Sequence, residues 1–360
     1  MEPLTRPHGL GTSATCIDRS KPDRSEDDGF WPPRFHIPFE SRMNPQVERV
    51  RAHSLAWARA NDLVTTDEAE RRLDAARFDR LTARFFPDAT GAALDLFGDW
   101  DLWYFLFDDS FDGPIGRNPA AAEQVLEPMI ATAAGDPARM NLDAPPMRAF
   151  AELCCRTGLG RSVQWRPRLA LDFAGYLDSY RWEAAYRCSG TQPDVETCIA
   201  MRRESIGVRS TLTCGETVDR FELAVPIFRS AAIQRMRDIT ADVVALVNDA
   251  FSLAKDLHHA DTNNVAVILM RTKGWSVGRA IHHLEDLVSG LVSEFQDLEH
   301  AAKALPATMF LPRERPNVER YLAMMRRLMR GNLDWSAETS RYHDHVPDTW
   351  RHGKNNHILL

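Results

Sequence analysis

Apolar residues recur at three- and four-residue spacing along most of the chain, and this spacing predicts amphipathic helices. The clearest stretches are VERVRAHSLAWARA (47–60), DLFGDWDLWYFLFDD (95–109), RLALDFAGYLDSYRWEAAYR (168–187), DITADVVALVNDAFSLAKDL (238–257) and YLAMMRRLMRGNLDW (321–335). Alternating patterns typical of strands are nearly absent. Short segments rich in Gly, Pro, Asn and Asp separate the helices at 112–119, 135–146, 189–194 and 259–264. We therefore expect an all-α fold.

The chain shows no repeat, linker or shift of composition that would divide it, so one domain over 30–345 is expected. Residues 1–29 mix Pro, Gly, Ser and charge without the apolar core of a secretory signal, which predicts a flexible N-terminal tail. The proline-broken segment 31–45 predicts an extended strap ahead of the first helix. Residues 346–360 are expected to form a C-terminal tail.

Composition narrows the class of protein. The 360 residues include 44 basic and 51 acidic side chains, a net charge of −7, and neither sign collects into a stripe that would bind nucleic acid. No apolar run approaches the roughly 18 residues of a membrane span. The six cysteines form no C-x-x-C pair, which favours a reduced compartment. We expect a cytoplasmic globular protein.

An acidic cluster ends the most aromatic of the predicted helices. Asp108 and Asp112 lie about 40° apart around the helix, whereas Asp109 points about 100° away from Asp108. Two carboxylates on one face beside aromatic bulk disfavour folding unless a cation or water screens them. A divalent metal site and a solvated helix end both remain open from this cluster alone.

A second polar set follows in the helix predicted over 238–257. Asn248, Ser252 and Asp256 are spaced four residues apart and form one polar row on an otherwise apolar helix. These side chains offer only oxygen ligands, which suit Mg²⁺ better than zinc or iron. The adjacent Lys255 is able to meet a phosphate as a point charge. The alternative is the wet face of a surface helix, which the apolar flanks disfavour.

Together, the two sets resemble the motifs of a known family. Asp108-Asp109-x-x-Asp112, followed some 140 residues later by Asn248-Asp249-x-x-Ser252-x-x-Lys255-Asp256, resembles the aspartate-rich and NSE motifs of bacterial class I terpene synthases. That family folds as a helical bundle around a central active-site cavity. Its last NSE ligand is usually Glu, and Asp256 is one methylene shorter.

Two further segments and the opening strap are similar to the same family. Met201-Arg-Arg-Glu-Ser-Ile-Gly207 resembles its R-R-x-[ST]-x-G segment, which implies Arg203 as diphosphate sensor and Gly207 at the effector kink. Trp335-x5-Arg341-Tyr342 resembles its C-terminal pair that caps bound diphosphate, with Trp335 facing the hydrocarbon.

The resemblance implies a terpene cyclase that ionises a prenyl diphosphate, with farnesyl diphosphate expected first because the FDGP context recurs among bacterial sesquiterpene cyclases. Three Mg²⁺ ions would be held by Asp108, Asp112, Asn248, Ser252 and Asp256, and the diphosphate by Arg203, Lys255, Arg341 and Tyr342. Tyr104 and Phe105, close to Asp108 on the helix, are expected to line the wall below the metal, although without the metal motifs ordinary core packing is the preferred interpretation of such rings.

Other readings stay open. A geranylgeranyl diphosphate cyclase would carry the same motifs. A chain-elongating prenyl transferase shares the fold but carries a second aspartate-rich cluster where this chain has Asn248 and Ser252. A di-iron bundle would need Glu-x-x-His pairs, and the sequence contains none. An inactive helical scaffold and a homodimer are also left open.

Overall fold

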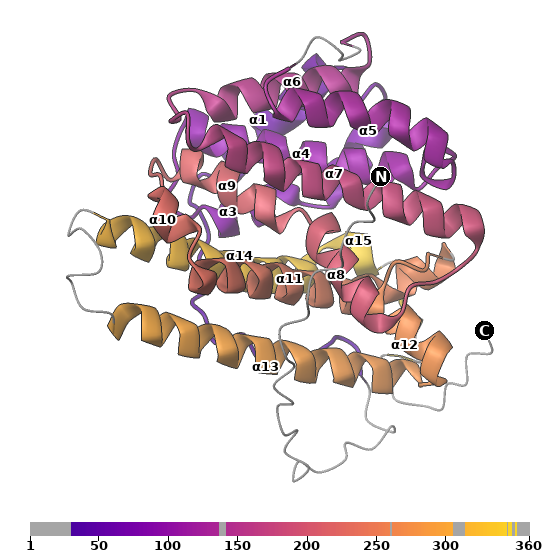
Figure 1. The fold of residues 1–360 in the computed structure, drawn as a ribbon. Coiled ribbons are helices and arrows are strands. Elements are labelled where there is room, and N and C mark those ends of the chain that lie inside the picture. The colour runs from indigo at the N-terminus through magenta and orange to yellow at the C-terminus, as the bar shows by residue number, and fades with distance from the viewer. Residues whose placement is uncertain are drawn as a thin grey trace, which may run out of the picture.

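In the computed structural model, the described residues are 30–136, 142–259, 261–304, 314–343, 345–347 and 350, and these ranges contain helices and turns but no strand. The predicted tail 1–29 lies outside them, as does most of the predicted tail 346–360. The all-α prediction is confirmed (Figure 1).

The helices follow one another with short connections. Those of the first half are α1 (Val47–Ala60), α2 (Asp67–Ala75), α3 (Phe78–Phe85), α4 (Ala92–Phe111), the 3₁₀ turn η1 (Ile115–Arg117), α5 (Pro119–Ala133), α6 (Pro145–Gly158) and α7 (Arg166–Ser189). Those of the second half are α8 (Val195–Ser205), α9 (Val208–Val218), α10 (Val225–Phe228), α11 (Ala231–His258), α12 (Val265–Lys273), α13 (Val277–Ala304), α14 (Arg315–Glu338) and α15 (Ser340–His343). All five stretches predicted from the apolar spacing lie within helices.

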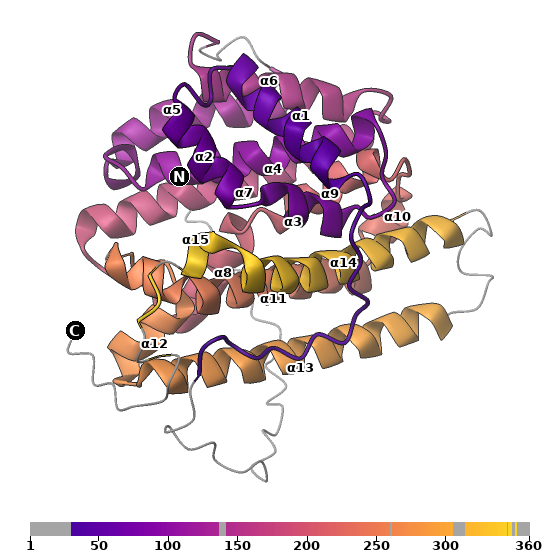
Figure 2. The same cartoon turned by 180° about the vertical axis from the view of Figure 1, so that it is seen from behind.

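The long helices α4 and α11 carry the two polar motifs, and they lie in different layers. Figure 1 shows α4 among α1, α5, α6 and α7, whereas α11 runs across the middle of the molecule beside α14. Helix α13 packs on the other side of α11 (Figure 2). Helices α8, α9 and α10 connect α7 to α11, and α9 contacts both of the motif-bearing helices, α4 and α11.

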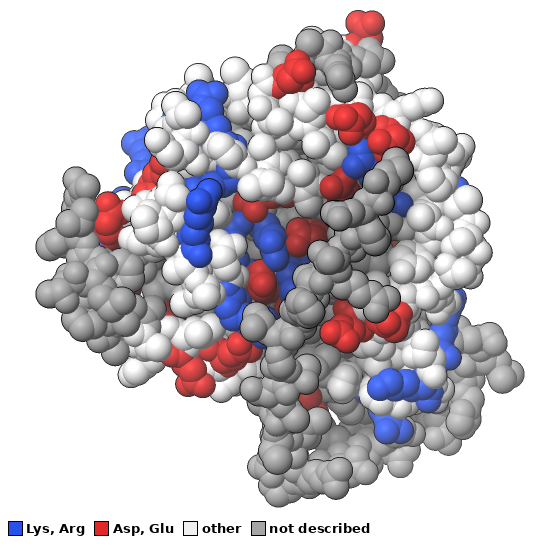
Figure 3. Space-filling model, viewed as in Figure 1, with Lys and Arg blue, Asp and Glu red and all other residues white. Residues whose placement is uncertain are grey.

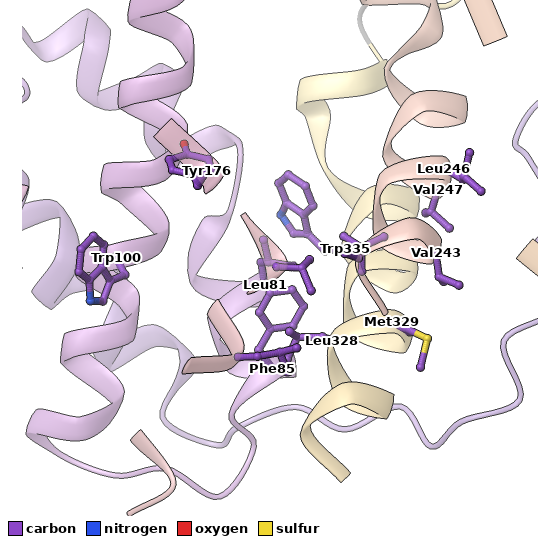
Figure 4. Close-up of a cluster of buried hydrophobic side chains, with 14 of the residues drawn as sticks. Leu81, Phe85, Trp100, Tyr176, Val243, Leu246, Val247, Leu328, Met329 and Trp335 are labelled. Atoms are coloured by element: carbon purple, nitrogen blue, oxygen red, sulfur yellow. The ribbon is translucent and has the colours of Figure 1, made fainter. Parts of the chain in front are cut away.

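Buried apolar side chains hold α14 between α3 and α11. In Figure 4, Trp335 and Leu328 of α14 lie next to Leu81 and Phe85 of α3. All four side chains are at most 5% exposed. Truncating a large residue in such packing typically costs about 3–5 kcal/mol, so α14 provides a firm base for the short α15 that follows it.

The extended segment before α1 runs along α13 and α14, as Figure 2 shows. The Arg34 backbone N–H donates to Glu285 Oε1 (2.6 Å), and Arg330 Nη1 donates to the Ile37 carbonyl (3.1 Å). The predicted strap is therefore present. Near its start, the Trp31 ring lies 6.2 Å from that of Trp350, which is buried although it belongs to the segment predicted as C-terminal tail.

On the face shown in Figure 3, acidic and basic side chains lie side by side rather than in separate fields. Within the described ranges, no helix is long and apolar enough to cross a membrane.

Candidate active site

The first acidic cluster lies where α4 ends. The helix stops at Phe111, and Asp112 is its C-cap. Asp108 is half-buried, and its Oδ1 accepts a hydrogen bond from the Tyr180 hydroxyl (3.2 Å). Loss of solvation and the neighbouring Asp108 raise the pKa of Asp112 to about 6. The cluster thus has a geometry in which an added positive charge is favourable.

The turn after α4 is tight enough to require glycine. An added Cβ at Gly116 would stand 1.8 Å from the Phe111 carbonyl oxygen, closer than any side chain tolerates. Arg187 of α7 donates to the same carbonyl (3.4 Å) and, through its other nitrogen, to Asp261 Oδ2 (3.1 Å). This close approach and the arginine bridge fix the end of α4 against α7 and the turn that follows α11.

The second motif forms one face of α11, as predicted. Ser252 Oγ donates to Asp256 Oδ2 (2.6 Å), which shows that residues four apart lie next to each other along the helix. Ser252 is buried and Asp256 is partly buried. Burial raises the pKa of Asp256, and the nearby Lys255 ammonium opposes that shift. The row contains an amide, a hydroxyl and a carboxylate, all with oxygen acceptors.

The pair Arg341–Tyr342 on α15 connects the two motifs. Arg341 Nη2 donates to Asp109 Oδ1 (2.7 Å) and lies 3.9 Å from Asp108 Oδ2. The Tyr342 hydroxyl accepts a hydrogen bond from Asn248 Nδ2 (2.7 Å). Two consecutive residues therefore contact the acidic end of α4 and the polar face of α11 at once. Asp109, predicted to point aside, is the carboxylate that holds Arg341.

Adjacent arginines on α8 have different partners. Arg202 donates from Nε to Asp249 Oδ1 and from Nη2 to Asn248 Oδ1, both at 2.8 Å. Arg203, the predicted diphosphate sensor, instead donates to both carboxylate oxygens of Asp242 at 2.7 and 2.8 Å. The structure thus brings Arg202 to the second motif, whereas Arg203 is paired with a residue earlier on α11.

Glycine at position 207 separates α8 from α9. Its φ is +71°, in the left-handed region that favours glycine, and an added Cβ would lie 3.5 Å from the rings of both Tyr104 and Tyr176. The kink predicted at Gly207 is therefore present, and it turns the backbone toward aromatic rings of α4 and α7. The Tyr104 hydroxyl donates to Ser210 Oγ (2.7 Å).

Phe105 and Trp335 pack against each other with ring centroids 5.4 Å apart. Phe105 keeps some accessible surface, whereas Trp335 is fully buried and donates from Nε1 to the Ala76 carbonyl (3.1 Å). Phe78 stacks on Phe105 at 4.0 Å. The structure brings the predicted aromatic residues together, with Trp335 behind Phe105.

The side chains fit a cation held by oxygen ligands from two helices, α4 and α11. Among the residues that the structure describes, no three His, Cys, Asp or Glu side chains form a ready-made metal cluster. The oxygen ligands are instead the carboxylates at the end of α4 and the mixed set of oxygens on α11. Arg341 supplies positive charge to the carboxylates of α4. Hard oxygen donors of this kind suit Mg²⁺.

Sequence reasoning did not single out Arg202, Tyr180 or Asn264. Arg202 belongs to the segment 201–207 that resembles the family motif, but the next residue, Arg203, was predicted as the diphosphate sensor. Asn264 precedes the apolar run that forms α12, and this N-cap pattern was a usable signal. Nothing in the sequence distinguishes Tyr180 from the other aromatic residues of α7.

Comparisons with known proteins agree on one family. Residues 99–294, more than half of the chain, match the family described as terpene synthase family 2, C-terminal metal binding. The chain is 38% identical over 312 residues to pentalenene synthase of Streptomyces avermitilis, covering 86% of this chain and 92% of that protein. It is 31% identical over 312 residues to (−)-β-caryophyllene synthase of Saccharothrix espanaensis, named as cyclising (2E,6E)-farnesyl diphosphate, with coverage of 86% and 88%.

A solved structure supports the same assignment. Germacradien-4-ol synthase from Streptomyces citricolor superposes with a TM-score of 0.76 at 27% identity, covering 87% of this chain and 99% of that one. The range matched by the family description contains both polar motifs and Arg202.

Proposed function

Because this chain belongs to the terpene synthase family, we propose that it ionises farnesyl diphosphate and cyclises the resulting carbocation to a sesquiterpene hydrocarbon or alcohol. The observation that carries the proposal is the Arg341–Tyr342 pair, which joins an acidic motif to an oxygen-donor motif distant in sequence. Such a site is suited to a substrate whose leaving group is strongly anionic.

Five residues would hold the metal, namely Asp108, Asp112, Asn248, Ser252 and Asp256, and three Mg²⁺ ions are expected. When bound, Mg²⁺ supplies positive charge that stabilises the diphosphate as its bond to carbon breaks. The carboxylates offer full charges at the end of α4, whereas Asn248 and Ser252 offer neutral oxygens on α11. A ligand set divided in this way between α4 and α11 leaves room for substrate oxygens to complete the coordination of the metal.

The diphosphate itself would be held by Arg202, Lys255, Arg341 and Tyr342. We assign the sensor role to Arg202 in place of Arg203, because Arg202 contacts α11 at Asn248 within the second motif, whereas Arg203 contacts it at Asp242, before that motif. A planar guanidinium is able to hold two phosphate oxygens at once, and the Lys255 ammonium acts as a point charge. Donors that are already in place need little reorganisation as charge develops on the leaving group.

The hydrocarbon would lie against Tyr104, Phe105 and the Gly207 backbone. Aromatic faces stabilise a cation by about 0.5–2 kcal/mol each, depending on how far water is excluded. Gly207 brings backbone within van der Waals reach of the same rings, and its carbonyl accepts hydrogen bonds from Ser210 Oγ (2.9 Å) and the Thr211 N–H (3.0 Å) at the start of α9. Trp335 supports this wall from behind by fixing Phe105.

The test is incubation of the purified protein with Mg²⁺ and C10, C15 or C20 prenyl diphosphates, followed by mass spectrometry of the extracted products. We expect a cyclic C15 product from farnesyl diphosphate and no turnover in excess EDTA. Preference for the C20 substrate would favour a diterpene cyclase. Longer prenyl diphosphates formed with added isopentenyl diphosphate would favour a prenyl transferase, and absence of any turnover would favour an inactive scaffold.

A further inference from the structure

Asn264 lies in the turn between α11 and α12 and is fully buried. Its Oδ1 accepts hydrogen bonds from the backbone N–H groups of Ala266 (2.9 Å) and Val267 (3.3 Å), so it is the N-cap of α12. Its Nδ2 donates to Asp256 Oδ2 and to the Asp249 carbonyl, both at 2.8 Å. The amide oxygen of Asn264 therefore caps α12, and its amide nitrogen contacts the second motif.

Helix α12 is a rigid support for this amide. Its first six residues, Val265 to Met270, are all buried. The Val265 backbone N–H donates to Asp249 Oδ2 (2.7 Å), and Arg202 holds the other oxygen of the same carboxylate. The start of α12 is thus attached to α11 at Asp249 and Asp256, and Asn264 cannot move without breaking these contacts.

The hydrogen bonds at Asp256 are unevenly distributed. Among the described residues, the donors to its side chain, Ser252 Oγ and Asn264 Nδ2, both reach Oδ2. Within the described part of the chain, no donor reaches Oδ1, so its lone pairs are left for another partner. A short Asp side chain reaches less far than Glu, so its usefulness as a ligand depends on how well it is oriented.

We propose that Asn264 is a positioning residue of the second motif: its amide holds Oδ2 of Asp256 so that Oδ1 is presented to a divalent cation. The proposal rests on the proposed function, because it assumes that Asp256 binds metal. Partners of metal-binding carboxylates commonly orient them in this way, and their loss weakens metal binding about 10- to 100-fold.

The test separates the two roles of Asn264, which are to cap α12 and to donate a hydrogen bond to Asp256. Asn264→Ser keeps a good N-cap but removes the group that reaches Asp256. Asn118→Ser is the matched control, because Asn118 caps α5 through Ala120 N (3.1 Å) and Ala121 N (3.2 Å) in the same way. Binding of inorganic diphosphate is followed by titration calorimetry at increasing Mg²⁺ concentration, and Tm is measured for each variant.

We expect Asn264→Ser to raise the Mg²⁺ concentration for half-maximal binding at least about tenfold, which is about 1.4 kcal/mol, and Asn118→Ser to leave it unchanged. In an Asp256→Ala background, Asn264→Ser should add no further change, because its effect passes through that carboxylate. Asn264→Thr, with the same cap chemistry, is used if the serine variant does not fold.

The outcomes distinguish the two proposals. A wild-type protein that binds no diphosphate with Mg²⁺ would count against the proposed function itself. If the wild type binds and Asn264→Ser matches Asn118→Ser, Asn264 is a helix cap only and the inference is overturned. A Mg²⁺ shift that persists in the Asp256→Ala background overturns it as well.

Discussion

Replacing each of two neighbouring arginines with lysine should have very different effects on turnover. Arg202 donates to Asp249, Asn248 and Ser205, with distances of 2.8, 2.8 and 3.0 Å. Arg203 makes two parallel hydrogen bonds to Asp242, lies 4.0 Å from Asp238 and is a quarter exposed. Both variants keep the positive charge, so the comparison measures geometry rather than charge.

The size of the effect follows from the number of donors lost. A single ammonium cannot span Asp249 and Asn248 as the guanidinium does, so Arg202→Lys loses at least one charge-assisted hydrogen bond, about 1.5–3 kcal/mol. Removing one donor aimed at developing negative charge typically lowers kcat about 10²–10³-fold. Arg203→Lys should lower stability by about 1–2 kcal/mol and change kcat less than about threefold, because its bonds serve packing of α8 on α11.

The assay is steady-state turnover of the preferred prenyl diphosphate at saturating Mg²⁺, with Tm recorded for both variants. An Arg202→Lys enzyme within about threefold of wild type, beside an Arg203→Lys enzyme reduced more than about 100-fold, would return the sensor role to Arg203. Equal losses in kcat would show that the partners on α11 do not distinguish the two side chains.

Three further outcomes are expected. Asp108→Asn should abolish turnover, whereas Asp109→Asn should lower kcat only about tenfold because it loosens Arg341; equal losses at saturating Mg²⁺ would contradict this difference. Gly207→Ala should lower stability by about 1–2 kcal/mol through its left-handed backbone and shift the product ratio, and unchanged Tm and products would refute the strain argument. Burial raises the pKa of Glu216 to about 7 from an ordinary 4.5, so the folded state holds more protons between these values and the free energy of unfolding falls as pH rises through them. Glu216→Gln, neutral throughout, should therefore show a smaller fall in Tm from pH 5 to pH 8 than wild type, and an equal or larger fall would contradict it.

The helices and their order could be predicted because apolar spacing reports local burial. The apolar stretch 47–60 coincides with α1, and the polar row at Asn248, Ser252 and Asp256 followed from helical geometry alone. The break at Gly207, expected from the family resemblance, is present, and its left-handed φ favours glycine.

Other features of the site depend on packing between distant segments. The choice between Arg202 and Arg203 depends on how α8 is rotated against α11, and two consecutive arginines in one sequence do not report that rotation. Asp109 was expected to point away from the chemistry, but α15 approaches from that side and places Arg341 on it. Asn264 lies in what the sequence presents as an ordinary turn, and its second hydrogen-bonding role exists only once α12 has packed.

The contact between α15 and the two motifs also bears on the order in which the protein is made. Synthesis proceeds from the N-terminus, so Asp109 leaves the ribosome 232 residues before its partner Arg341. A chain that stops before α15 therefore carries the acidic cluster without the cation that compensates it and the second motif without Tyr342. Prematurely terminated chains should accordingly be inactive, and the cell gains the carbocation chemistry only when translation has passed residue 342.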